Sequence, residues 1–128
     1  MNVLVTQEQV NMLEKLIGKL ESHHIEISAL SKKAPNDAVN KFKIKFLNTV
    51  LTECNKFLGD DYRAVEDFEQ FDVDSVPSNS DVTFILSLYL QAVEKFRSDH
   101  IEPIGVFWVY RMSSKDKIRT GPPAKLRK

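Results

Sequence analysis

The chain has 128 residues, 42% of them hydrophobic and 28% charged, which are ordinary values for one globular domain. Its single cysteine excludes an internal disulfide, and four glycines and five prolines are too few for a many-turned β-sandwich. We expect a soluble, cytoplasmic protein, because the sequence shows neither a signal pattern nor an apolar run of about 18 residues. Its size and composition suggest a microbial system.

The first predicted helix starts at Thr6, which forms a capping box with Gln9, and ends before Pro35. A second helix, opened by Asn36 or Asp37, ends at Gly59, where a left-handed residue is favoured. A third covers residues 81–99. Each carries an apolar stripe with helical spacing. In the second helix this stripe comprises Val39, Phe42, Phe46, Leu47, Val50, Leu51, Cys54, Phe57 and Leu58.

Three wide stripes predict an all-α fold, an antiparallel three-helix bundle that forms a single domain over residues 1–110. The connection between the second and third helices is long and acidic: residues 59–81 hold eight acids and one base, net −7. Tyr62, Val65, Phe68 and Phe71 recur every three residues within it, which favours a short helix near 60–71 docked on the bundle.

Residues 104–111 are apolar and rich in β-forming side chains, so they are a candidate strand. A lone strand is unstable, and the sequence offers three partners for it: residues 3–5, the same strand of a second subunit, or another protein. The alternative is no strand, with Phe107 and Trp108 packed over the end of the bundle. Residues 111–128 hold seven bases and one acid, net +6, and read as a flexible basic tail.

The sequence shows no catalytic or metal-binding constellation. A calcium loop starting at Asp72 would need glycine and glutamate where Pro77 and Thr83 stand. Cys54 lies on an apolar face and reads as a small buried hydrophobe. Phosphate-binding glycine motifs are absent. Arg97 and His100 are closer together than the arginine and histidine of HEPN-class ribonucleases, so a small helical nuclease remains only a second alternative.

We therefore expect a non-enzymatic interaction module or accessory subunit, without a cofactor, a small-molecule site or a membrane partner, that binds a protein or a second copy of itself. Aromatic and arginine side chains concentrate at such interfaces. The candidate partner-binding residues are Asp60, Asp61, Tyr62, Glu66, Asp67, Phe68, Glu69, Phe71, Trp108, Tyr110 and Arg111.

The first alternative is nucleic-acid binding, in which basic residues contact phosphates while Trp108 and Tyr110 stack on bases. The basic residues are Arg111, Lys115, Lys117, Arg119, Lys125, Arg127 and Lys128. The sequence leaves open whether the acidic segment and the basic tail pair within one molecule or with partners.

Overall fold

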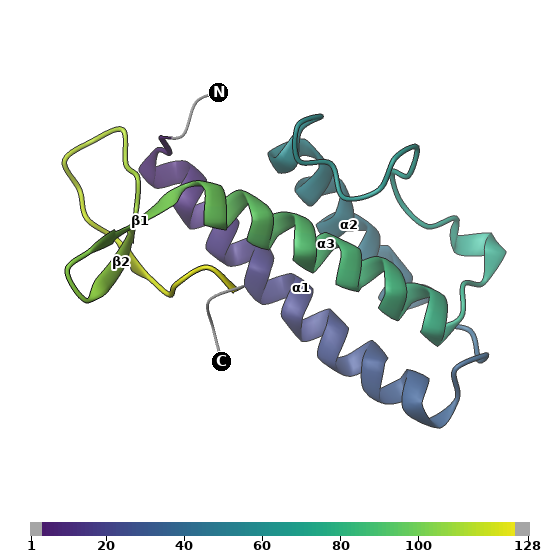
Figure 1. Cartoon of the computed structure of the whole chain (residues 1–128). Coiled ribbons are helices and arrows are strands. Elements are labelled where there is room, and N and C mark those ends of the chain that lie inside the picture. The colour runs from purple at the N-terminus through teal and green to yellow at the C-terminus, as the bar shows by residue number, and fades with distance from the viewer. Residues whose placement is uncertain (1–3, 125–128) are drawn as a thin grey trace.

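The computed structural model describes residues 4–124 (Figure 1). Three helices come first, α1 (Gln7–Lys33), α2 (Lys41–Leu58) and α3 (Asn79–Asp99), with a short 3-10 helix, η1 (Val73–Ser75), before α3. Three strands follow: β1 (Ile101–Ile104), β2 (Phe107–Tyr110) and β3 (Arg119–Thr120). The helices form a bundle, and the strands lie at the end of it where α1 begins and α3 ends.

α1 begins and ends as the sequence predicts. The Thr6 hydroxyl accepts a hydrogen bond from the Gln9 N–H, and the Gln9 side chain accepts one from the Thr6 N–H, which completes the capping box. Val5 and Val10, on either side of this turn, are both buried. The helix ends at Lys33, shortly before Pro35.

α2 begins later than predicted, at Lys41 rather than near Asn36 or Asp37. Residues 34–39 instead form a turn and an isolated bridge between Ala38 and Ser78. The N-cap is therefore Asn40, whose side chain accepts a hydrogen bond from the Phe42 N–H at 2.7 Å.

The predicted apolar face of α2 is wrong at its aromatic start. Phe42 and Phe46 are 67% and 56% exposed, whereas Ile44 between them is fully buried. Two residues along an α-helix correspond to about 200° of rotation, so a helix that turns Ile44 inward turns both phenylalanines outward. The rest of the face is buried or half-buried as predicted.

α3 starts at Asn79, slightly before the predicted residue 81, because Ser78 caps it by accepting a hydrogen bond from the Asp81 N–H. Leu86, Tyr89 and Val93 bury its apolar face. α3 packs antiparallel to α1, more extensively than either helix packs on α2. The core therefore lies chiefly between α1 and α3, with α2 closing one side.

The prediction of an all-α fold is wrong, because residues 101–120 form a three-stranded antiparallel sheet in the order β1-β2-β3. Ile104 lies opposite Phe107 across a two-residue turn, and Gly105 has the positive φ (60°) that such hairpin turns favour. The candidate strand thus pairs with segments that flank it in its own chain. Residue 5 contributes only a single parallel bridge, from Val5 to Met112.

The predicted flexible tail is also wrong for residues 111–124, because the chain returns to the sheet. Arg119 and Thr120 lie opposite Val109 and Trp108, and Pro123 is buried. β2 lies before the predicted boundary between the helical domain (1–110) and the tail (111–128), and β3 lies after it. Their pairing therefore connects the two predicted parts. The last predicted basic residues, Lys125, Arg127 and Lys128, lie outside the described residues.

Candidate interaction surface

The acidic segment, residues 59–81, runs from the end of α2 to the start of α3 without the short helix predicted near 60–71 (Figure 1). Its regular structure is limited to η1 and the first residues of α3. Side chains bind its backbone in place of helical hydrogen bonds. The segment is therefore irregular but attached to the bundle at many points.

Two buried asparagines of α2 bind the backbone of this segment. The Asn48 amide donates to the Phe71 carbonyl oxygen at 2.8 Å and accepts from the Phe71 N–H at 2.9 Å. The Asn55 amide donates to the Glu69 carbonyl oxygen at 3.0 Å and accepts from the Tyr89 hydroxyl at 2.8 Å. Asn48 and Asn55 lie two helical turns apart and so share one face of α2. That face fixes residues 69–71.

Arg63, the one base of the segment, folds it onto itself. Its Nε donates to the Val65 carbonyl oxygen at 3.0 Å, and its Nη2 donates to the Phe68 carbonyl oxygen at 2.7 Å. Nη2 also forms an ion pair with Glu69, and the Arg63 side chain is only 17% exposed. A planar guanidinium with several donors can bind two carbonyls and a carboxylate at once, which closes residues 63–69 into a compact loop.

The aromatic side chains of the segment pack against the bundle or against each other. The rings of Phe68 and Phe71 meet edge-to-face with 5.2 Å between centroids, and Phe71 is buried. Tyr62 meets Phe96 of α3 edge-on at 5.1 Å, and its hydroxyl donates to Asp99 Oδ2 at 2.8 Å. Burial and this carboxylate acceptor raise the pKa of Tyr62 to about 12. Three of the predicted partner-binding residues therefore attach the segment to its own protein.

The carboxylates of the segment face solvent. Asp60, Asp61, Glu66 and Asp67 are exposed, and none of the four forms an ion pair within residues 4–124. Glu69 is bound by Arg63. Within the same range no ion pair joins the acidic segment to a base of residues 111–124, called the C-terminal segment below. Four of the predicted partner-binding acids therefore form an exposed, unpaired group, called the acidic surface below.

The structure divides residues 104–111 into a packed part and an exposed part. Tyr110 is 2% exposed, and Trp108 packs against the buried core. Ile104 and Phe107 are 42% and 46% exposed. Alternate residues of a strand point to opposite faces, so Phe107 and Trp108 are separated by the sheet. Arg111, the last predicted contact residue of this stretch, lies 3.7 Å from Glu102.

An ion pair on α3 between buried Arg97 and half-buried Glu94, which the sequence did not single out, holds residues 120–124. Arg97 is 4% exposed, and its Nε and Nη2 each donate to the Glu94 carboxylate at 2.8 Å. It also donates to the Thr120 hydroxyl and to the carbonyl oxygens of Gly121 and Pro122. The sequence signal would have been a Glu and an Arg one helical turn apart, each beside a residue of the apolar stripe.

Glu94 extends this attachment by accepting a hydrogen bond from the Ala124 N–H at 2.9 Å. Burial alone would raise the pKa of Glu94, but the hydrogen bonds from Arg97 and Ala124 together hold it below its usual value. His100, the other residue of the nuclease hypothesis, instead stacks on Phe96 with 4.1 Å between centroids. The His100 N–H donates to the Arg97 carbonyl oxygen at 3.0 Å, but the Arg97 guanidinium binds Glu94 and residues 120–122 while the His100 ring stacks on Phe96.

An open cavity of about 450 Å³ lies between α1 and α3 beside the Glu94–Arg97 ion pair. Ile17, Leu90 and Val93 line its apolar part, and Glu14 and Glu21 of α1 line its polar part. The cation that lines it, Arg97, already donates to Glu94 and to the C-terminal backbone. The hydrogen-bond donors of Arg97 are therefore used within the fold and not for a ligand in the cavity.

Other candidates for chemistry are explained by packing. Burial raises the pKa of the Cys54 thiol to about 12, which fits a buried hydrophobe better than a nucleophile. In the described part of the chain no group of three or more His, Cys, Asp or Glu side chains could hold a metal ion. None of the helices within residues 4–124 is long and apolar enough to cross a bilayer.

No protein family, curated protein or solved structure shows a significant match to this chain. A function must therefore be inferred from the geometry of the chain itself.

Proposed function

We propose that the protein is a non-enzymatic interaction module that presents its acidic surface to a basic surface of a partner protein. One contrast supports this proposal. The backbone and aromatic groups of residues 59–74 are bound to the bundle, whereas Asp60, Asp61, Glu66 and Asp67 are exposed without ion-pair partners.

Two physical effects favour binding by such a surface. A segment already fixed by Asn48, Asn55 and Arg63 loses little conformational freedom when a partner binds, so less of the interaction energy is spent on ordering it. Complementary charge further accelerates association and makes it sensitive to salt.

Charge reversal of the acidic surface tests the proposal. We expect the triple variant Asp60→Lys, Asp61→Lys, Glu66→Lys to bind its partner at least about tenfold more weakly, because attraction becomes repulsion. The partner is captured from an extract of the native cell after nuclease treatment and identified. Its affinity for purified wild-type and variant protein is then measured by calorimetry at low and at high salt.

The matched control is Glu8→Lys, Glu14→Lys, Glu21→Lys on α1, which changes the net charge equally at exposed positions outside the acidic segment. It should leave the affinity within about twofold of wild type. Equal losses in both variants would mean that only the overall charge matters. Unchanged affinity in the Asp60, Asp61, Glu66 variant would show that the acidic surface is not the contact.

A further inference from the structure

The β1–β2 hairpin ends in an exposed apolar tip, defined here as Ile104, Val106 and Phe107. Their exposed fractions are 42%, 89% and 46%. Gly105 makes the turn between the strands, so the hairpin ends abruptly at these side chains. Figure 1 shows the hairpin projecting from the end of the bundle, with no helix beside its tip.

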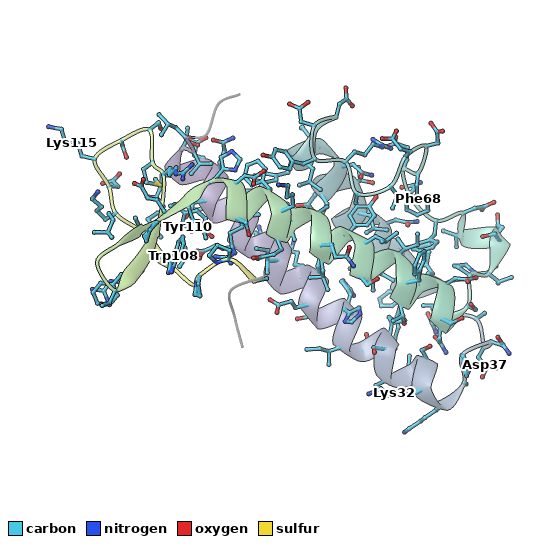
Figure 2. The ribbon with its side chains drawn as sticks, viewed as in Figure 1. Lys32, Asp37, Phe68, Trp108, Tyr110 and Lys115 are labelled. Carbon is cyan, nitrogen blue, oxygen red and sulfur yellow. The ribbon has the colours of Figure 1, made fainter. Side chains whose placement is uncertain are left out.

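Exposed cations accompany the tip. The Arg119 guanidinium carbon lies 3.7 Å from the centroid of the Phe107 ring. Lys115 and Lys117 are exposed on the loop between β2 and β3, and Lys115 extends into solvent at the same end of the molecule (Figure 2). None of these three cations forms an ion pair within residues 4–124. Four bases and two acids give residues 101–120 a net charge of +2.

The chemistry of the tip selects among possible partners. Isoleucine and valine have no π-face on which a base could stack and no polar group that could bind a phosphate, so they contribute little to nucleic-acid recognition. Tyr110, which could stack, is buried. Aliphatic and aromatic side chains gain free energy by leaving water for hydrocarbon, and neighbouring Lys and Arg are attracted to anionic headgroups.

We propose that the hairpin tip and the β2–β3 loop form a docking surface for an anionic lipid membrane. Ile104, Val106 and Phe107 enter the boundary between headgroups and acyl chains, while Lys115, Lys117 and Arg119 contact the headgroups. The sequence predicts no membrane partner because it lacks a spanning segment, whereas docking by a hairpin tip requires none. The register of β1 and β2 places Ile104 opposite Phe107 on one face of the hairpin and leaves Val106 in the turn. This inference does not depend on the acidic surface.

Co-sedimentation with lipid vesicles tests the proposal. Purified protein is mixed with vesicles of phosphatidylcholine alone or of phosphatidylcholine with phosphatidylserine, at low ionic strength. We expect binding to the phosphatidylserine vesicles, weakened at least about tenfold by Val106→Asp. Lys115→Gln with Lys117→Gln should weaken binding and reduce its dependence on phosphatidylserine.

The matched control is Ile25→Asp on α1, which adds the same charge at another exposed aliphatic side chain, 72% exposed. It should leave vesicle binding unchanged, and circular dichroism with thermal unfolding verifies that both variants fold. Several results would overturn the proposal: no sedimentation with either vesicle, equal losses in the Val106 and Ile25 variants, or retention of RNA that Val106→Asp does not affect. Self-association that disappears in Val106→Asp without vesicle binding would assign the tip to a second copy instead.

Discussion

At the scale of single residues, the asparagine at position 48 determines where the acidic segment lies. Its amide supplies one donor and one acceptor, and both are used on the backbone of Phe71. Asn48 is only 7% exposed, so water cannot easily replace these bonds. A buried peptide group without a partner costs free energy, which makes this side chain a structural requirement of the acidic surface.

We predict that Asn48→Ala lowers the free energy of unfolding by about 2 kcal/mol, because the Phe71 N–H and carbonyl oxygen lose their partner. Chemical denaturation measures the loss. In the Asn48→Ala variant, hydrogen exchange relative to wild type should quicken more at the Phe71 amide than at amides in the centre of α3. The control Thr52→Ala changes an exposed position of the same helix and should stay within about 0.5 kcal/mol of wild type. Wild-type exchange at Phe71 in the Asn48 variant would contradict the assigned role.

At the scale of elements, the helices could be predicted because their stripes are long and periodic. The stripe of α2 predicts burial of Phe42 and Phe46, which is wrong, because a large aromatic side chain near a stripe counts as a core candidate whichever way it points. Periodicity cannot show which edge of a wide stripe faces the neighbouring helices, and Ile44 turned out to be the buried residue.

The sheet could not be predicted with equal ease, because each of its strands has four residues or fewer. β1 contains Glu102 and Pro103, which read as the end of a helix, although proline is tolerated in an edge strand. β3 has only two residues within a stretch that is polar and basic. The Thr120 hydroxyl of β3 accepts a hydrogen bond from Arg97, which lies more than twenty residues away in the sequence.

The candidate site was likewise only half visible in the sequence. Composition alone identified Asp60, Asp61, Glu66 and Asp67 as an acidic group, and the structure leaves them exposed. The attachment of the segment was not predicted. An asparagine within a helix reads as a neutral surface residue until the backbone that it binds is known.

The attachment of β3 yields a prediction for Arg97. We expect Arg97→Gln to lower the free energy of unfolding by about 3 kcal/mol, because it leaves the half-buried Glu94 carboxylate with fewer donors and removes hydrogen bonds from a buried side chain to residues 120–122. Urea denaturation followed by Trp108 fluorescence measures this loss, and hydrogen exchange should quicken at Thr120.

Lys95 provides the control for Arg97. It is a neighbouring cation of α3 whose side chain is 68% exposed and bound to Asp99. Exposed helix ion pairs contribute little, so Lys95→Gln should cost less than about 0.5 kcal/mol. Similar losses in both variants would show that burial of the guanidinium is not what matters.

At the scale of the whole molecule, the opposite charges of residues 59–81 and 111–128 nearly cancel. Within residues 4–124, however, different side chains attach the acidic segment and the C-terminal segment to the bundle. The acidic segment is bound by Asn48, Asn55 and Arg63, and the C-terminal segment by Glu94 and Arg97. Neither attachment uses a charge of the other segment. The two segments are therefore independent surfaces of one domain.

Because the two segments are attached independently, we predict different stability losses when the exposed lysines are neutralised and when β3 is removed. Lys115→Gln with Lys117→Gln should leave the free energy of unfolding within about 0.5 kcal/mol of wild type, because neither lysine has an ion-pair partner among residues 4–124. A chain ended after Met112 should lose several times more, about 3 kcal/mol, since it lacks β3 and the backbone acceptors of Arg97.

Chemical denaturation in low and in high sodium chloride distinguishes the two origins of stability. Buried bonds are screened little by salt, whereas attraction between exposed charges weakens strongly over the same range. The loss in the shortened chain should therefore be similar in both salts. If high salt removes most of the difference, or if the double lysine variant is destabilised as much as the shortened chain, then the acidic and basic segments are paired electrostatically. In that case the acidic surface would already be occupied by its own chain and would not be open to a basic partner.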